Sequence, residues 1–310
     1  MKDKNTNTLL KTTVMERNDE YLNEKINKHL SELDQYTNFN KNSKIDYLYH
    51  YTDINGCLGI LNNKTLWASN AFFLNDSSEI NYGLELSYPL FKSFYSSLKS
   101  ERAKEILKEF NDDFPEFVLS SNLFLISFCE DGDLLSQWRG YSQNNDGVSI
   151  RFNLPILRTF PKVNLLKVVY DENIQINILN HLFELLNELI EYLEKGKNIS
   201  FLPYFTLWIS IFTTMILTLK DCSFSEEKEW RIIYNHDAAG NNKNIEYRIR
   251  NNYILPYIQI DKLNLIDLVN EITIGPSSSF NIIIKSINYF LYMNNYHFIG
   301  INQSKIPYRK

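Results

Sequence analysis

A stretch of twenty residues without a charged side chain, Ser200 to Leu219, most constrains the fold of this chain. Large apolar residues such as Trp208 and Phe212 lie within it and favour a buried environment. Its length is near the roughly 20 residues of a membrane-spanning helix. However, it also holds Pro203 and Ser210, and no Lys/Arg-rich segment flanks it. We therefore expect a buried central helix and no membrane contact.

Composition narrows the class of protein. The chain has 310 residues, of which 44% are hydrophobic and 14% aromatic, enough for a sizeable core. The net charge of −5 does not indicate nucleic-acid binding, although a local basic groove remains open. The cysteines, Cys57, Cys129 and Cys222, are odd in number and widely spaced, which favours reduced thiols. With a polar N-terminus that lacks a signal-type apolar stretch, this predicts a cytoplasmic protein.

The polar N-terminal segment, residues 1–44, is predicted to be a helical arm. Its periodic part predicts a helix from about Val14 to Tyr36 with one narrow apolar stripe formed by Leu22, Ile26, Leu30 and Leu33. Such a stripe can pack on the main body or on a second copy of the chain. A homo-oligomer formed through this helix is therefore one expectation.

Residues 45–310 are predicted to form a single catalytic-type domain with a helical insert at about 172–220. The insert begins with apolar residues at the helical period from Ile174 to Leu193. Helices interrupt the strands in blocks, so the predicted class is α+β. Strand candidates are 47–52, 65–70, 123–129, 148–152, 165–170, 253–260, 272–276 and 297–301, and further helices are expected at 54–63, 77–109 and 280–293.

The segment 225–232 carries the most suggestive polar pattern. As a strand it would place Glu227, Glu229 and Arg231 on one face, because side chains alternate with a period of two. Trp230 and Ile232 would then face the core. Two carboxylates beside a guanidinium fit a polar site. They equally fit a solvated edge strand in which Arg231 neutralises a carboxylate.

Several common chemistries lack their motifs. No phosphate-binding glycine loop, no Gly-x-Ser-x-Gly and no metal-type spacing of histidines or cysteines occurs in the sequence. We therefore predict no metal site. Among the histidines, His50 lies mid-strand and suits a ribose hydroxyl, or equally a satisfied place in the core.

Three further segments offer polar groups, each with a structural alternative. Ser127 is a lone hydroxyl in an apolar strand, which needs a ligand or a backbone partner. The motif 75–79 reads as a helix-capping turn as well as a binding loop. The segment 137–141 contains Trp138 and Arg139, whose flat side chains can stack on a nucleotide ring. It can equally be a loop that packs on the core.

Taken together, these pieces resemble a family, the bacterial domain of unknown function 2971, over roughly 45–309. The motifs that carry the resemblance are Tyr49-His-Tyr-Thr52, Leu66-Trp-Ala-Ser69, Phe73-Leu-Asn-Asp-Ser-Ser-Glu79, Ile126-Ser-Phe-Cys-Glu130, Leu135-Ser-Gln-Trp-Arg-Gly-Tyr141, Gly147-Val-Ser-Ile150, Glu227-Lys-Glu-Trp-Arg231, Ile274-Gly-Pro276 and Ser304-Lys-Ile-Pro-Tyr308. They occur in family order.

That family is similar, more distantly, to ADP-ribosyltransferases. The resemblance implies a split mixed or antiparallel sheet with NAD, as substrate, in a central cleft. It makes Glu229 the catalytic glutamate, His50 the ribose-binding residue and Glu227 the upstream residue that helps select or activate the acceptor. All three are expected to be catalytic. The implied NAD-binding residues are His50, Tyr51, Thr52, Ser69, Asn75, Ser127, Trp138, Arg139 and Tyr141. The stacking aromatic stays open among Trp67, Tyr82, Trp138 and Tyr141.

The function expected from this resemblance is cleavage of the nicotinamide–ribose bond, by an ADP-ribosyltransferase or an NAD glycohydrolase, of the kind found in toxins and antiphage effectors. The acceptor is an unknown protein, nucleic acid or water. One alternative is a metal-dependent nuclease that uses Asp76, Glu79, Asp131, Glu227 and Glu229. The other is a non-catalytic nucleotide-sensing module of a defence system.

Overall fold

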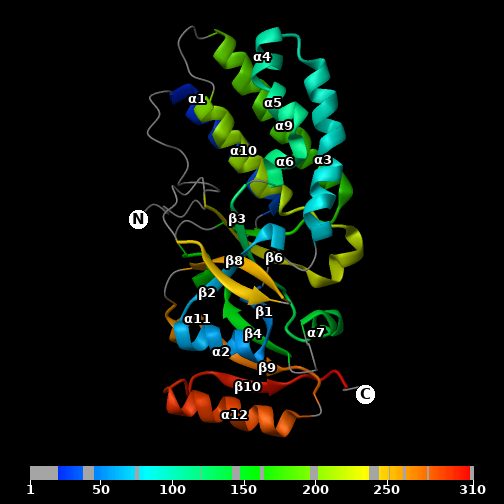
Figure 1. Ribbon diagram of the computed structural model, residues 1–310. Coiled ribbons are helices and arrows are strands. Elements are labelled where there is room, and N and C mark those ends of the chain that lie inside the picture. The colour runs from blue at the N-terminus through cyan, green and yellow to red at the C-terminus, as the bar shows by residue number, and fades with distance from the viewer. Residues whose placement is uncertain are drawn as a thin grey trace.

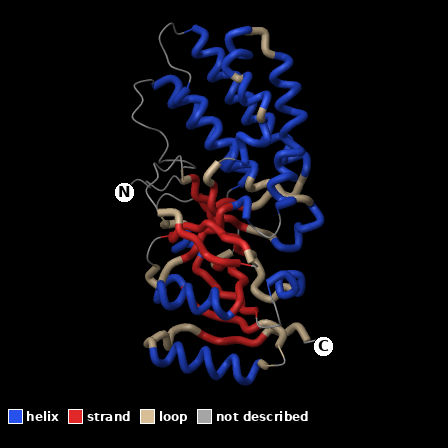
Figure 2. Tube along the Cα trace, in the orientation of Figure 1, coloured by secondary structure: helices blue, strands red, loops and turns tan. Residues whose placement is uncertain are grey.

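The computed structural model describes residues 20–37, 45–73, 77–119, 121–141, 147–160, 164–195, 202–236, 244–250, 252–260, 263–277 and 279–307. These residues form an α+β structure with two sheets and a large helical part (Figures 1 and 2).

The larger sheet has six antiparallel strands in the order β5-β6-β3-β2-β8-β7. Its strands are β2 (Leu66–Asn70), β3 (Leu123–Phe128), β5 (Asn164–Lys167), β6 (Trp230–Asn235), β7 (Glu246–Arg250) and β8 (Tyr253–Ile260). Because β6 lies between β5 and β3, Arg231 is not on an edge strand. The solvated edge-strand interpretation of this segment is therefore wrong.

The smaller sheet has four strands in the order β1-β4-β9-β10, in which only the β9–β10 pair is parallel. The strands are β1 (Tyr47–Asp53), β4 (Gly147–Asn153), β9 (Val269–Ile274) and β10 (Gly300–Gln303). Among the described residues, an isolated antiparallel bridge joins the two sheets, with both backbone N–H···O bonds between Tyr49 and Cys129 at 2.8 Å. This bridge brings β1 against the end of β3.

Side-chain alternation divides the larger sheet between two cores. Phe124, Ile126 and Phe128 of β3 face a core that is shared with the smaller sheet. Leu123 and Leu125, on the opposite face, join the core of the helical part. By the same alternation, Trp230 and Ile232 of β6 lie in the inter-sheet core, as predicted. Ser127 and Arg231 must therefore lie on the face toward the helices.

The helical half packs on that second face and occupies one end of the molecule (Figure 1). It comprises α1 (Glu20–Thr37), α3 (Ser77–Ser97), α4 (Glu101–Ile106), α5 (Lys108–Asp112), α6 (Phe114–Leu119), α9 (Glu172–Lys195) and α10 (Leu202–Ile216). The expected insert at 172–220 supplies only α9 and α10. The helical half is therefore larger than the predicted insert, because α1 and α3–α6 share its core.

The N-terminal helix α1 packs against α9 of the same chain. Its stripe, Leu22, Ile26, Leu30 and Leu33, is buried in the core of the helical half. The stripe that suggested a homo-oligomer is thus covered by this chain's own helices. The first residues of the predicted helix, 14–19, lie outside the described residues.

Helix α10 is the predicted buried helix. From Tyr204 to Ile216 nearly every side chain is buried, and Trp208 donates a hydrogen bond from its indole nitrogen to the carbonyl of Leu182 at 2.7 Å. Pro203 stands in the first turn, where its missing N–H costs nothing. Among the described helices, none combines the length and apolarity that crossing a bilayer would need.

The remaining helices flank the sheets at their other faces and ends. These are α2 (Ile54–Asn63), α7 (Leu135–Tyr141), α8 (Leu154–Leu157), α11 (Leu265–Leu268) and α12 (Phe280–Met293). Asp53 caps α2 through a hydrogen bond from the N–H of Gly56 at 2.6 Å. Helix α12 covers the smaller sheet at the end opposite the helical half (Figure 1).

The sequence prediction fails at several places, among them the helix expected at 77–109, which is divided into α3, α4 and α5. Residues Cys222–Glu227 form a 3₁₀ helix, so Glu227 is not on the strand with Glu229. Lys228 has a φ of 43°, and this left-handed residue turns the chain into β6. Residues 135–141 form a helix and not a loop, and β7 was not predicted.

Candidate functional site

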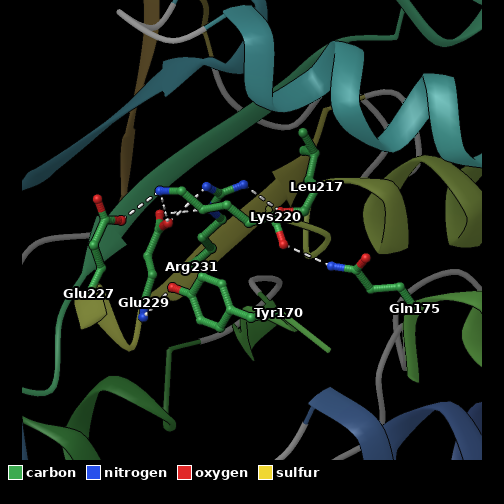
Figure 3. Close-up of polar contacts among 7 residues, drawn as sticks. All are labelled: Tyr170, Gln175, Leu217, Lys220, Glu227, Glu229 and Arg231. Atoms are coloured by element: carbon green, nitrogen blue, oxygen red, sulfur yellow. Dashed lines mark hydrogen bonds and ion pairs between the residues drawn. The ribbon is translucent and has the colours of Figure 1, made fainter. Parts of the chain in front are cut away.

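Glu229 sits just before β6 at the centre of a buried polar network (Figure 3). Its Oε1 accepts a hydrogen bond from Nε of Arg231 at 2.7 Å, and its Oε2 accepts one from Nη2 at 2.9 Å. Nζ of Lys220 donates to the same Oε2 at 2.9 Å and to Oε2 of Glu227 at 2.6 Å. Glu229, Arg231 and Lys220 are 3%, 2% and 4% exposed. We call these residues, with Ser127, the Glu229 network.

The two cations decide the charge of this carboxyl. Burial by itself raises the pKa of Glu229, but Arg231 and Lys220 outweigh it, and a hydrogen bond from Ser127 adds to their effect. The pKa is therefore lowered, and Glu229 is ionised at neutral pH. A carboxylate offers about four acceptor positions. The three bonds from the two cations and the one from Ser127 fill them.

The backbone of Glu229 is fixed as well. Its N–H donates to the hydroxyl oxygen of Tyr170 at 3.0 Å, and its carbonyl accepts from the N–H of Val168 at 2.9 Å. Nη1 of Arg231 donates to the carbonyl of Leu217, just beyond α10, at 2.7 Å. The network is thereby tied to both the larger sheet and the helical half.

Lys220 is held in place by Gln175 of α9. The fully buried amide nitrogen of Gln175 donates to the carbonyls of Val169 at 2.6 Å and Lys220 at 2.8 Å. Its amide oxygen accepts from the hydroxyl of Tyr82 at 2.8 Å. One side chain thus satisfies two backbone carbonyls of the segments that enter the site, and Figure 3 draws the bond to Lys220.

Ser127 links Glu229 to His50. In the β3–β6 register Ser127 lies opposite Arg231, which explains why its hydroxyl reaches the carboxylate of Glu229. The carbonyl of Ser127 is 2.9 Å from Nδ1 of His50 on β1. Three strands that are distant in sequence thus bring together the predicted residues His50, Ser127 and Glu229.

The contact with Ser127 defines the proton position on His50. A carbonyl oxygen only accepts, so Nδ1 must carry the hydrogen and Nε2 of a neutral ring is an acceptor. Burial lowers the pKa of His50, and the nearby Arg248 lowers it further. The ring is therefore neutral at pH 7. Its Nε2 can accept a hydrogen bond from a hydroxyl group.

Trp138 is a core residue. It is 3% exposed, its ring packs edge-on against Tyr51 at 4.8 Å, and its Nε1 donates to Oδ1 of Asp133 at 2.8 Å. Asp133 also accepts from the hydroxyl of Ser304. Tyr51 is equally engaged, since its hydroxyl donates to the carbonyl of Asp131 at 3.0 Å. Both side chains thus use their polar atoms within the protein, and their contact with a nucleotide stays a prediction.

The other predicted binding residues are dispersed. Arg139 is exposed on α7, and Thr52 is half-buried against the close approach of Gly56. The hydroxyl of Ser69 on β2 accepts a hydrogen bond from Nη2 of Arg248 at 2.9 Å. Asn75 and the side chain of Tyr141 lie outside the described residues.

Arg248 on β7 is an incompletely satisfied cation near His50. Its guanidinium carbon lies 5.4 Å from the ring centre of Trp67 and 5.6 Å from that of Tyr257, yet its buried Nε makes no hydrogen bond. Burial lowers the pKa of Arg248, and the neighbouring Arg250 lowers it further. Such a group is suited to an anionic ligand.

Sequence reasoning missed Lys220, Tyr170 and Arg248. Lys220 carried a signal, because it is the first charge after the uncharged stretch that ends at Leu219. Arg248 could have been found from the alternation in Glu246–Arg250, which places its charged residues on one face. Tyr170 carried no signal beyond its place at the end of a predicted strand.

The carboxylates of the nuclease alternative do not form a metal site in the part of the chain that is described. Lys220 bridges Glu227 and Glu229, so a cation already occupies the space between them. Asp131 is exposed and accepts from the N–H of Asp133. Asp76 and the side chain of Glu79 lie outside the described residues.

The fold and the site define an α+β protein with one mixed and one antiparallel sheet and a buried carboxylate–cation network beneath a helical half. The family model described as "Protein of unknown function (DUF2971)" matches residues 137–232, which supports the predicted family. The matched segment runs from α7 to β6 and includes Lys220, Glu229 and Arg231. Neither the search of curated proteins nor that of solved structures found a match.

Proposed function

We propose that this protein is an ADP-ribosyltransferase-like effector that cleaves the nicotinamide–ribose bond of NAD. The observation that supports the proposal is the meeting of His50, Ser127 and Glu229 at the junction of the two sheets. Such an activity would suit a toxin or an antiphage effector of the cytoplasm. The acceptor would be a protein, a nucleic acid or water.

The proposed chemistry follows from the charges at this junction. Departure of nicotinamide leaves an oxocarbenium-like ribose, which an ionised carboxylate stabilises. Glu229 supplies that carboxylate, because Arg231 and Lys220 keep it ionised. Nε2 of His50 would accept a hydrogen bond from a ribose hydroxyl and orient the sugar.

Binding of NAD requires Glu229 to give up one of its present partners. The ribose hydroxyl needs an acceptor position, and all of these are filled. Lys220 is the donor that can leave at least cost, since it retains Glu227 at 2.6 Å. Arg231 cannot leave as readily, because two bonds hold it to Glu229. We propose that Lys220 moves toward Glu227 when NAD binds.

Arg248 is the proposed contact for the pyrophosphate. It interacts electrostatically with His50 and has a free Nε, so a phosphate beside the ribose site would complete its hydrogen bonds. Trp67 packs beside the guanidinium of Arg248 and, of the four aromatics considered, is the one proposed to stack on a ring of NAD.

The test is nicotinamide release from NAD by the full-length chain, with and without protein, DNA or RNA as acceptor. His50→Ala should reduce turnover by about 100-fold, as loss of precise substrate positioning can do. His297→Ala, the same change at an exposed histidine between α12 and β10, should have no effect. Equal activity of H50A and the wild type would refute the assignment.

The non-catalytic alternative has one observation in its favour, the complete pairing of Glu229. NAD binding that H50A weakens, without nicotinamide release under any condition, would replace the catalytic proposal with a sensing module. Nucleic-acid cleavage that a chelator abolishes would instead support the metal-dependent nuclease and refute the catalytic proposal.

A further inference from the structure

A second polar cluster lies in the helical half, where α1 crosses α9. His29 and Glu32 are one turn apart on α1, and His181 faces them from α9. One ligand atom from each of the three residues lies within 4.8 Å of the other two. The rings of His29 and His181 are in edge contact at 4.8 Å. We call these three residues the His29 cluster.

The hydrogen bonding of the His29 cluster is incomplete. His29 is 4% exposed, yet neither of its ring nitrogens makes a hydrogen bond. Its Nε2 lies 3.5 Å from Oε2 of Glu188. Nε2 of His181 is 2.5 Å from Oε2 of Glu32, but the approach does not have hydrogen-bond geometry. Buried imidazole nitrogens without partners cost free energy unless a ligand satisfies them.

The chemistry of these donors selects a class of ligand. Two imidazoles and a carboxylate are the ligand set of three-residue zinc sites, with water as the fourth ligand. Burial lowers the pKa of His29, so the ring is neutral, which is the form that binds a metal. Glu188 lies beside the cluster and adds negative charge, partly neutralised by Lys25 at 3.1 Å.

We propose that His29, Glu32 and His181 bind a divalent transition-metal ion, with zinc as the preferred ion, that fastens α1 to α9. Glu32 is only partly buried, so the ion can enter from solvent on that side. The three ligands need only a small approach, since metal–ligand bonds of about 2.0–2.2 Å require ligand atoms roughly 3–3.5 Å apart. This proposal shares no residue with the Glu229 network and is independent of NAD chemistry.

The bound ion would complete an interface that is otherwise apolar. On the same helix, the side chains of Ile26, Leu30 and Leu33 pack into the core of the helical half. Metal binding adds a link between two helices that are far apart in sequence. Metal binding to the folded state alone must stabilise that state. Removal of the ion should therefore loosen α1 before the rest of the chain.

The experiment uses the full-length chain without a histidine tag, stripped with chelator and titrated with zinc in a calorimeter. One zinc ion per chain is expected, with no competition from a large excess of Mg²⁺, because imidazole sites favour zinc. Glu32→Gln and His181→Ala should each weaken zinc binding by at least about tenfold, since even the partners of metal ligands contribute that much. Glu24→Gln, an exposed glutamate on the same helix, is the matched control.

A second readout separates a metal site from an ion pair. In the wild type, zinc should raise the thermal midpoint and slow hydrogen exchange in α1. In E32Q and H181A it should do neither. Absence of zinc binding by the wild type, or equal zinc affinity of the wild type and H181A, would overturn the proposal and leave an ion pair between Glu32 and His181.

Discussion

Replacement of Glu229 by glutamine tests the central feature of the site, the buried pairing of one carboxylate with two cations. The variant removes the negative charge while Arg231 and Lys220 stay 2% and 4% exposed. Loss of one partner of a buried ion pair typically costs about 3–5 kcal/mol, because the other charge is left uncompensated. The glutamine oxygen can still accept one bond, and Lys220 keeps Glu227. We therefore expect a loss of about 3 kcal/mol.

The assay is unfolding by urea, followed by tryptophan fluorescence, to which the buried Trp138, Trp208 and Trp230 contribute, and by circular dichroism. Urea is preferred to guanidinium chloride, whose ions would screen the interaction under study. A loss of about 3 kcal/mol lowers the ratio of folded to unfolded molecules roughly 150-fold. Glu227→Gln is the matched control. Its side chain is 16% exposed, against 4% for that of Glu229, so its loss should be less than half as large.

A double-mutant cycle isolates the pair itself. Arg231→Met combined with Glu229→Gln removes both charges. The double variant should be more stable than the sum of the single losses predicts by at least about 1 kcal/mol. If Glu229→Gln costs less than about 1 kcal/mol, or no more than Glu227→Gln, the carboxylate is not the buried partner of these cations and the reasoning fails. Loss of activity in this variant would not by itself prove catalysis, because the variant is also less stable.

The remaining predictions concern the supports of the site and of α1. Gln175→Ala should lower the free energy of unfolding in urea by at least about 2 kcal/mol, since two buried carbonyls and a tyrosine hydroxyl lose their hydrogen-bond partner. A loss below about 0.5 kcal/mol, which is typical of surface substitutions, would contradict its role. Ile26→Ala should cost about 2–5 kcal/mol, whereas Lys28→Ala on the exposed face should be nearly neutral. The free energy of unfolding should also decrease as the pH drops below 4.5, the ordinary pKa of a glutamate, because the pKa of Glu229 is lowered in the folded state. A Glu229→Gln variant should show a flatter pH profile in the same acid range.

Local periodicity predicted much of the fold. The boundaries of α2 and α12 match the predicted 54–63 and 280–293, and the alternation around Trp230 placed it in the core. These features depend on neighbours within a few residues, so a single sequence contains them. Where a local pattern was ambiguous, as at 225–232, the prediction placed Glu227 on the strand. In the structure, the left-handed residue Lys228 separates Glu227 from the strand.

The candidate site was only partly predictable. His50, Ser127 and Glu229 could be chosen from the sequence, and the structure brings them together. Trp138 was chosen as a candidate ligand contact because it is aromatic and beside an arginine. The bond of its Nε1 to Asp133 and the contact with Tyr51 show that it belongs to the core. Composition cannot distinguish the two roles, since both require a flat apolar ring with one donor.

The sequence by itself determined the α+β class, the buried helix at 202–216 and the apolar faces of the strands, because hydrophobic period and length fix these features locally. Only the tertiary structure decided that Lys220 and Arg231 share Glu229, and that His29 meets His181 across α1 and α9. Both arrangements depend on strand register and on helix packing between distant segments. No spacing along the chain reports these contacts, and for that reason the sequence showed neither the second cation of the site nor the His29 cluster.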